Sequence, residues 1–527
     1  MCGLGLLGGP CAAHEDAWAS LVREIARRGT CAAHTGPDAL AVESLELGTR
    51  SVRLAASVLG LRGTDVTPQP MRAASLWFVW NGEVFADTAH PVPHATNDGA
   101  ALFARIHARA DREAALVETL ATVDGPYAFL LLDVRRALTQ TTLARVWYGR
   151  DPLGRRSLLR AHTPELCLTS AASREALDAG FAFEEVPCAS LWCTDLATHW
   201  PVARGAPSDV RLVVSDAPHA EDAPFLDALH ALLSESVARR VTQIRRAPAQ
   251  RADDARVAVL FSGGVDCTVL AALAHQHVPA DEAIDLVNVA FENPRVLAAH
   301  APRETYAVPD RLTARASAAE LRALAPHRRW HLVEVDVPYE AYEAHLPHIH
   351  ALLAPCTSVM DLSIAAALYF AARAHGTVGG APYVSPARVF LSGLGADELL
   401  GGYARHRHAF LRGGLDALRA ELQLDLDRLP TRNLGRDDRV VSAHAREARF
   451  PFLARAVLAA VCAMPLANKA DLAPGTEGAG DKRLLRTLAR RLGLVHAACL
   501  PKRAIQFGAR SAKLDAASAR RKGSDVL

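Results

Sequence analysis

The chain has 527 residues, 50% of them hydrophobic and 22% charged, which allows two or three domains with substantial cores and excludes a disordered chain. A formal net charge of +2 provides no basic field of the kind that nucleic-acid-binding proteins use. The 10 cysteines form no CxxC pair, which argues for reduced thiols, and no apolar run reaches the roughly 18 residues of a membrane span. We therefore expect a cytoplasmic protein without nucleic-acid or membrane partners, and a homodimer is left open.

The first two hundred residues predict a layered α+β domain with antiparallel sheets. Helices are expected around 15–28 and 97–119, and strands within 76–85, 123–134 and 146–159. In the first of these strands, Asn81-Gly82 is expected to form a turn whose amide groups could donate to an oxyanion.

Cys2 follows the initiator methionine directly. Removal of that methionine would leave a thiol beside a free α-amino group, which can serve as its base. Judged by position alone, a start codon followed by any small residue is the stronger explanation. The choice therefore depends on the rest of the chain.

The second half of the chain predicts an alternating α/β domain after a linker over residues 201–222, which is rich in Pro, Ala, Asp and Ser. The expected strands cover 257–261, 284–291, 330–337 and 388–391, and the expected helices cover 266–276, 310–325, 339–353 and 358–374. Such alternation is typical of a mostly parallel sheet covered on both faces, with ligands at the carboxyl ends of the strands.

Two glycine-rich segments follow predicted strands of this domain. The first is VAVLFSGGVDCTVL (257–270), in which Ser262, Gly263 and Gly264 form a turn before a helix, an arrangement that favours a phosphate site. The second is LSGLGADELLGGYARHR (391–407), which also carries carboxylates. Two unrelated loops are the alternative, but both lie in one alternating domain and could face one polyphosphate.

The first half resembles the class II glutamine amidotransferases. The shared features are Cys2-Gly3, Asn81-Gly82-Glu83, Asp98, the segment DGPYAF (124–129) and the segment RDPLG (150–154). The resemblance implies that Cys2 attacks glutamine, that Asn81 and Gly82 form the oxyanion hole, and that Asp98 holds the substrate amino group. The family's carboxylate-binding arginine is replaced by Val58, so Arg62 is the candidate substitute, with Arg53 as an alternative.

The second half resembles the ATP-pyrophosphatase domain of the asparagine synthetases. The motifs are SGGVDC, SGLGADELLGGY and EARFPFL (447–453). With the first half, they imply an α+β N-terminal nucleophile domain of αββα layers, then an adenine nucleotide α-hydrolase-like α/β domain. The implied bounds are residues 2–200, a linker at 201–222, residues 223–515 and a flexible tail at 516–527.

The resemblance also implies ligands and roles. Glutamine would supply ammonia, ATP would activate the aspartate carboxylate, and AMP and pyrophosphate would be released. The implied ATP and pyrophosphate contacts are Phe261, Ser262, Gly263, Gly264, Asp266, Cys267, Ser392 and Gly393. The implied magnesium ligands are Asp266, Asp310 and Asp397.

Three departures fall on residues of the reaction. Cys267 replaces a serine, Leu394 replaces a glutamate, and Ala504 replaces a lysine that stabilises the transition state. Lys502 and Arg503, just before Ala504, are the candidate replacement cations for the adenylation step. These changes resemble the subgroup called asparagine synthetase domain-containing proteins. They leave open a weak or inactive protein with a binding or regulatory role, or a ligase for another carboxylate.

Overall fold

The computed structural model describes residues 3–10, 14–29, 38–47, 50–91, 93, 95–136, 142–162, 165–188, 190–202, 214–215, 221–248, 250–294, 305–476, 478–514 and 522–527. The chain forms two compact units. The first comprises Met1–Ser208, His345–Thr357 and Leu429–Glu447, and the second comprises Asp209–Ala344, Ser358–Arg428 and Ala448–Leu527. Within the described ranges, no helix has both the length and the apolar character needed to cross a membrane.

Antiparallel sheets form the centre of the first unit. In its described part, one sheet has the order β12-β10-β11-β1-β3-β2 and a second has the order β14-β13-β9-β8-β5-β4. The strands of the first sheet are β1 (Gly3–Pro10), β2 (Ala39–Leu47), β3 (Arg50–Val58), β10 (Leu159–Ala161), β11 (Leu166–Thr169) and β12 (Glu184–Glu185). Those of the second are β4 (Met71–Ala73), β5 (Leu76–Gly82), β8 (Tyr127–Arg136), β9 (Thr142–Arg150), β13 (Leu191–Thr194) and β14 (His199–Val202). A separate pair joins β6 (Ala86–Asp87) to β7 (Val123–Asp124).

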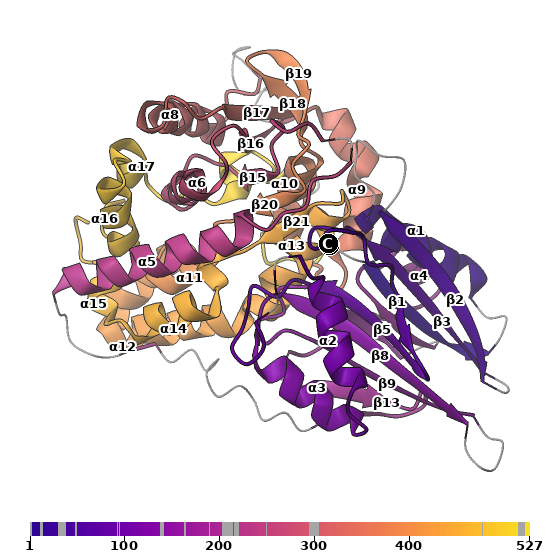
Figure 1. The fold of residues 1–527 in the computed structure, drawn as a ribbon. Coiled ribbons are helices and arrows are strands. Elements are labelled where there is room, and N and C mark those ends of the chain that lie inside the picture. Colours follow the sequence, from indigo (N-terminus) through magenta and orange to yellow (C-terminus); the bar gives the residue numbers. More distant parts are fainter. Residues whose placement is uncertain are drawn as a thin grey trace. The chain divides into compact units, whose positions relative to one another are not determined.

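Helices cover the outer face of each sheet. They are α1 (Glu15–Gly29), α2 (Asp98–His107), α3 (Arg112–Ala121) and α4 (Arg174–Asp178). One core lies between the sheets and joins Leu54 of β3 to Leu130 of β8. A second core packs α2 and α3 on the other sheet, and a third packs α1 and α4 on the first (Figure 1). These layers confirm the expected αββα arrangement.

Two local expectations for this unit are wrong. The single helix expected over 97–119 is two helices, because Asp111 caps the start of α3 by accepting from the amides of Glu113 and Ala114. Asn81-Gly82 is not a turn but the end of β5, paired with β8. A Cβ at Gly82 would lie 2.7 Å from the Cβ of Tyr127, so the glycine permits close strand packing rather than a reversal of the chain.

A segment from late in the chain completes the first unit. Helix α13 (Gly435–Ser442) carries Asp438, whose side chain is fully buried. Its carboxylate pairs with Arg28 at 2.8 Å and Arg156 at 3.3 Å, and it accepts from the Ser157 amide at 3.0 Å. Part of α9 (Tyr339–Leu353) also belongs here. The first unit is therefore discontinuous in sequence.

A mostly parallel sheet forms the centre of the second unit. Over the described residues its order is β19-β18-β17-β16-β15-β20-β21. The strands are β15 (Val257–Leu260), β16 (Ile284–Phe291), β17 (Trp330–Val337), β18 (His375–Val378), β19 (Ala381–Val384), β20 (Val389–Leu391) and β21 (Glu447–Arg449). Strands β17, β16, β15 and β20 pair in parallel, and β18 and β19 form an antiparallel edge. The expected parallel core is confirmed.

Helices pack on this sheet. The helices not yet named are α5 (Asp222–Val241), α6 (Val265–His277), α8 (Pro309–Leu324), α10 (Val359–Arg373), α11 (Ala396–Leu400), α12 (Ala404–Leu429), α14 (Arg455–Ala463), α15 (Leu466–Lys469), α16 (Arg483–Arg491), α17 (Val495–Cys499) and α18 (Ile505–Gly508). In Figure 1, α6 and α8 lie to one side of the strands and α10 to the other. The four expected crossover helices are present with shifts of one residue or less.

The flexible tail expected over 516–527 is described in part. Residues 515–521 lie outside the described part, but residues 522–527 are described. The amides of Val359 and Met360 donate to the carbonyls of Asp525 and Gly523, and Ser358 forms a bridge with Val526. The last residues therefore satisfy backbone donors at the start of α10, which otherwise lack partners within the helix.

Candidate functional site

The first glycine-rich loop joins β15 to α6 at the carboxyl end of the strand. Gly263 has a φ of 80°, and a Cβ there would lie 2.6 Å from the Thr313 backbone in α8, so glycine is required. Its carbonyl accepts from the Ser317 hydroxyl at 2.7 Å. Gly264 caps α6, and a Cβ there would meet only the Ser262 hydroxyl oxygen. The loop is held on α8 and leaves the N-terminus of α6 available to an anion.

The second loop lies against the first because β20 pairs directly with β15. The Ser392 amide donates to the Arg449 carbonyl of β21 at 2.9 Å, which fixes the start of the loop. A Cβ at Gly393 would lie 3.0 Å from the Cβ of Asp266. The structure thus brings the two predicted loops together.

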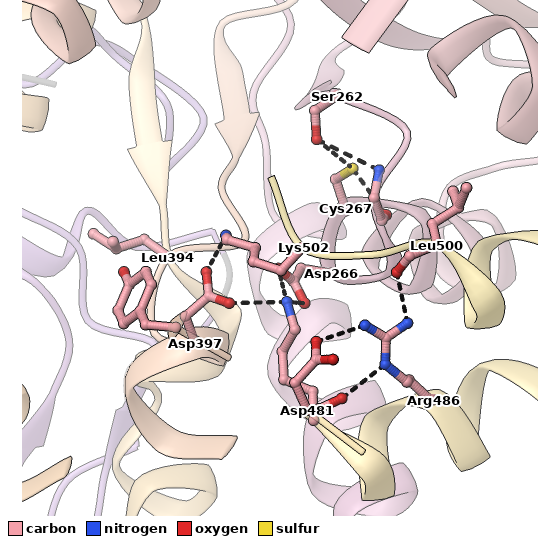
Figure 2. Close-up of polar contacts among 12 residues, drawn as sticks. Ser262, Asp266, Cys267, Leu394, Asp397, Asp481, Arg486, Leu500 and Lys502 are labelled. Carbon is pink, nitrogen blue, oxygen red and sulfur yellow. Dashed lines mark hydrogen bonds and ion pairs between the residues drawn. The ribbon is translucent and has the colours of Figure 1, made fainter. Parts of the chain in front are cut away.

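A buried lysine lies between the carboxylates of these loops. Lys482 Nζ is 2.8 Å from each Asp266 oxygen and 2.9 Å from Asp397 Oδ1. Lys502 also pairs with Asp397, and Figure 2 shows Asp266 and Asp397 near each other with Lys502 beside Asp397. Burial opposes its charge, but the two carboxylates outweigh burial and raise the pKa of Lys482. Burial likewise opposes the charge of Asp397, yet the two ammonium groups hold its pKa well below the usual range.

The third predicted acid, Asp310, lies in the first turn of α8. Its side chain is buried, and its carboxylate is 3.5 Å from Arg503 Nη1. Burial raises the pKa of Asp310 to about 7, against the opposing effects of Arg503 and Lys502. A Cβ at Gly508 would lie 2.0 Å from this carboxyl group, so α18 packs closely over it.

Several of these groups, among them Asp266, Asp310 and Lys482, line one pocket, called the SGG pocket below. It is lined by Ser262, Gly264, Val265, Asp266, Asp310, Thr313, Lys482, Arg486, Leu500, Pro501, Lys502 and Arg503. A serine hydroxyl, a helix N-terminus and four cationic side chains therefore meet at the carboxyl ends of parallel strands. This combination suits a polyanion such as a triphosphate.

The three aspartates predicted to hold magnesium face cationic side chains in this arrangement. Asp266 and Asp397 share the Lys482 ammonium, and Asp310 faces Arg503. Across the described residues, no group of three or more His, Cys, Asp or Glu side chains is arranged to hold a metal ion. The assignment of Mg²⁺ to these aspartates stays a prediction.

The three departures from the family pattern occupy different positions. The Cys267 thiol donates to the Gly264 carbonyl at 3.2 Å, so it points back into its own loop. Leu394 and Ala504 are not among the residues that line the SGG pocket, but Lys502 and Arg503 both line it. The predicted replacement cations therefore reach the pocket although Ala504 does not.

The predicted glutamine contacts cluster in the first unit. Asp98 is buried at the start of α2, and its carboxylate accepts from the amides of Val84 at 2.7 Å and Gly99 at 2.9 Å. Burial raises the pKa of Asp98, and the Arg62 charge opposes that shift. Arg62 donates to the Val84 carbonyl, two residues beyond Gly82 of β5.

The other residues predicted to act on glutamine are Asn81, Arg53 and Cys2. Asn81 is fully buried in β5. Arg53, the alternative to Arg62, pairs with Glu15 at 2.8 Å. Cys2 lies outside the described residues, so its role stays a prediction.

Lys482 and Arg486 belong to the site but carried no signal in the sequence. They lie in GAGDKRLLRTLARR (478–491), a pattern that predicts only a loop followed by a helix. Arg486 donates to the carbonyls of Ala498 at 3.0 Å and Leu500 at 2.7 Å, which holds the segment before Lys502. Only the spatial packing of α16 against α6 could identify them.

Comparisons with known proteins agree along most of the chain. Residues 228–522 match the family model described as Asparagine synthase. Asparagine synthetase domain-containing protein 1 of Gallus gallus is 33% identical, with 87% of this chain and 89% of that protein covered. The Homo sapiens protein of the same name is 32% identical (87% and 88% covered), and an asparagine synthetase domain-containing protein of Saccharomyces cerevisiae is 32% identical (89% and 86%). Among solved structures, a glutamine phosphoribosylpyrophosphate amidotransferase of B. subtilis is 14% identical, with 58% of this chain and 69% of that chain covered. Its TM-score of 0.29 is too low to bear on the fold.

Proposed function

The chain belongs to the asparagine synthase family, and we propose that it is a glutamine-hydrolysing, ATP-dependent amide ligase that converts aspartate to asparagine. The observation that carries the proposal is the SGG pocket. There the phosphate-type loop, the α6 N-terminus and the cations Lys482, Lys502 and Arg503 face one space.

The pocket's residues support activation of a carboxylate by ATP. A carboxylate oxygen of the acyl substrate attacks the α-phosphorus, the bond to the β-phosphate oxygen breaks, and pyrophosphate leaves. The Ser262 hydroxyl and the α6 N-terminus hold the pyrophosphate, while Lys502 and Arg503 balance the charge that develops. Ammonia then attacks the acyl carbon, AMP leaves, and the nitrogen loses a proton.

The first unit would supply the ammonia. In this proposal Cys2 attacks the glutamine side-chain amide, and Asn81 and Gly82 stabilise the oxyanion. Asp98 is suited to bind the substrate ammonium because two backbone amides hold its carboxylate in place. Arg62, which acts on Asp98 electrostatically, is the candidate for the glutamine carboxylate.

The test is ATP–pyrophosphate exchange by the purified protein with aspartate and a panel of other carboxylates. Aspartate-dependent exchange is expected; exchange with a different carboxylate would redefine the acyl substrate. ATP binding without exchange on any carboxylate would instead favour a binding or regulatory role, the second candidate, which Leu394 and Ala504 support.

A Cys2→Ala variant tests the division of labour between the halves. It should lose glutamine-dependent product formation and keep ammonium-dependent formation, because ammonium bypasses the nucleophile. Product formation and pyrophosphate release are measured with each nitrogen source. Equal loss with both sources would contradict the assignment of glutamine hydrolysis to Cys2.

A further inference from the structure

Lys482 occupies the space between the two carboxylates that were predicted to hold a metal ion. Its ammonium lies 2.8 Å from both oxygens of Asp266 and 2.9 Å from Asp397, and the residue is 2% exposed. We propose that Lys482 is the resident cation of this carboxylate pair, so that the pair binds no divalent ion unless a nucleotide is present. The inference rests on the proposed function only in taking the SGG pocket as the nucleotide site.

The backbone fixes Lys482 in this position. The residue caps α16 in the left-handed region, with a φ of 52°. Its amide donates to the carbonyl of Leu400, the last residue of α11, the helix that carries Asp397. Its own carbonyl accepts from the Arg486 amide at 3.0 Å. The backbone of Lys482 is therefore held by α11, which bears one of its carboxylate partners, and by α16, and the side chain extends from this fixed point to the two acids.

The charges of the site favour the ammonium over a free metal ion. Asp397 already has a second cation, Lys502, and the described residues hold no group of three metal-ligating side chains that could surround a divalent ion. Such an ion between Asp266 and Asp397 would leave the Lys482 charge buried without its partners, which is strongly unfavourable. Lys482 is thus a positioning residue that holds the two loops together through their acids.

The experiment is a Mn²⁺ titration without nucleotide, followed by the electron paramagnetic resonance signal of free Mn²⁺. Wild type and Lys482→Arg, which keeps the charge, should show no saturable binding at this site. Lys482→Met should show saturable Mn²⁺ binding, with an affinity about tenfold or more above any residual binding by wild type, because both carboxylates become available. The double variant Lys482→Met/Asp266→Asn should lose that gain, and Lys522→Met, at an exposed position, should match wild type.

Cooperative thermal unfolding first establishes that Lys482→Met is folded. Saturable Mn²⁺ binding by wild type that Asp266→Asn removes would overturn the proposal, and so would a folded Lys482→Met without the gain. If Lys482→Met does not fold, the comparison of wild type with Asp266→Asn decides alone. Absent ATP–pyrophosphate exchange would overturn the proposed ligase but leave this metal-binding pattern intact, so the two failures are distinguishable.

Discussion

Gly263→Ala and Gly264→Ala form a matched pair of substitutions in one loop. A Cβ at position 263 would lie 2.6 Å from the Thr313 backbone, and the φ of 80° is unfavourable for alanine. The left-handed conformation costs about 1 kcal/mol, and overlap with backbone that cannot rotate away costs about 1–3 kcal/mol more. We therefore expect Gly263→Ala to lower the free energy of unfolding of the second unit by about 2–4 kcal/mol.

Gly264→Ala should behave differently. Its φ is −66°, and the added methyl group would meet only the Ser262 hydroxyl oxygen, at 3.5 Å. The expected change in the free energy of unfolding is below about 1 kcal/mol, because alanine fits and restricts the unfolded chain. Urea denaturation followed by far-ultraviolet circular dichroism gives both values, and hydrogen exchange locates the effect in α6 and α8. Equal effects of the two substitutions would refute the steric argument.

Two further pairs of measurements concern buried acids. Because burial raises the pKa of Asp310 from 3.8 to about 7, the unfolded chain loses this proton at lower pH than the folded chain, and wild-type stability should fall from about pH 4 to about pH 7. Asp310→Asn should remove that fall, so its free energy of unfolding should exceed that of wild type by about 2–4 kcal/mol at neutral pH and equal it below pH ~4. Thermal unfolding of both proteins across this pH range measures the difference, and parallel pH profiles would contradict the reasoning. Asp438→Asn should cost about 3–5 kcal/mol in urea denaturation, because the buried Arg28 and Arg156 both lose this counter-charge, although Arg156 keeps its pair with Glu447 at 3.1 Å. The control Asp416→Asn, whose side chain is 86% exposed, should cost less than about 0.5 kcal/mol, and equal costs would show that burial does not decide the effect.

The regular elements near the pocket could be predicted because their residues carry strong periodic signals. Strands β16 and β17 match the expected ranges, since runs such as IDLVNVAF are rich in β-branched and other apolar residues and are followed by polar residues. The Asn81-Gly82 turn could not be predicted correctly, because the same dipeptide serves a turn or a close strand contact. Only the packing of Tyr127 against Gly82 distinguishes the two.

The αββα order of the layers was implied by the family resemblance. The sequence by itself determined a layered domain with antiparallel sheets, a parallel α/β domain and two glycine-rich loops that lie against each other. These depend on local patterns: alternation of strands and helices, and small residues at strand ends. The tertiary structure alone decided that Lys482 lies between Asp266 and Asp397, and that residues 435–442 belong to the first unit. Both involve charges brought together from distant positions in the chain, and a charged residue shows its partner only after folding places the two side by side.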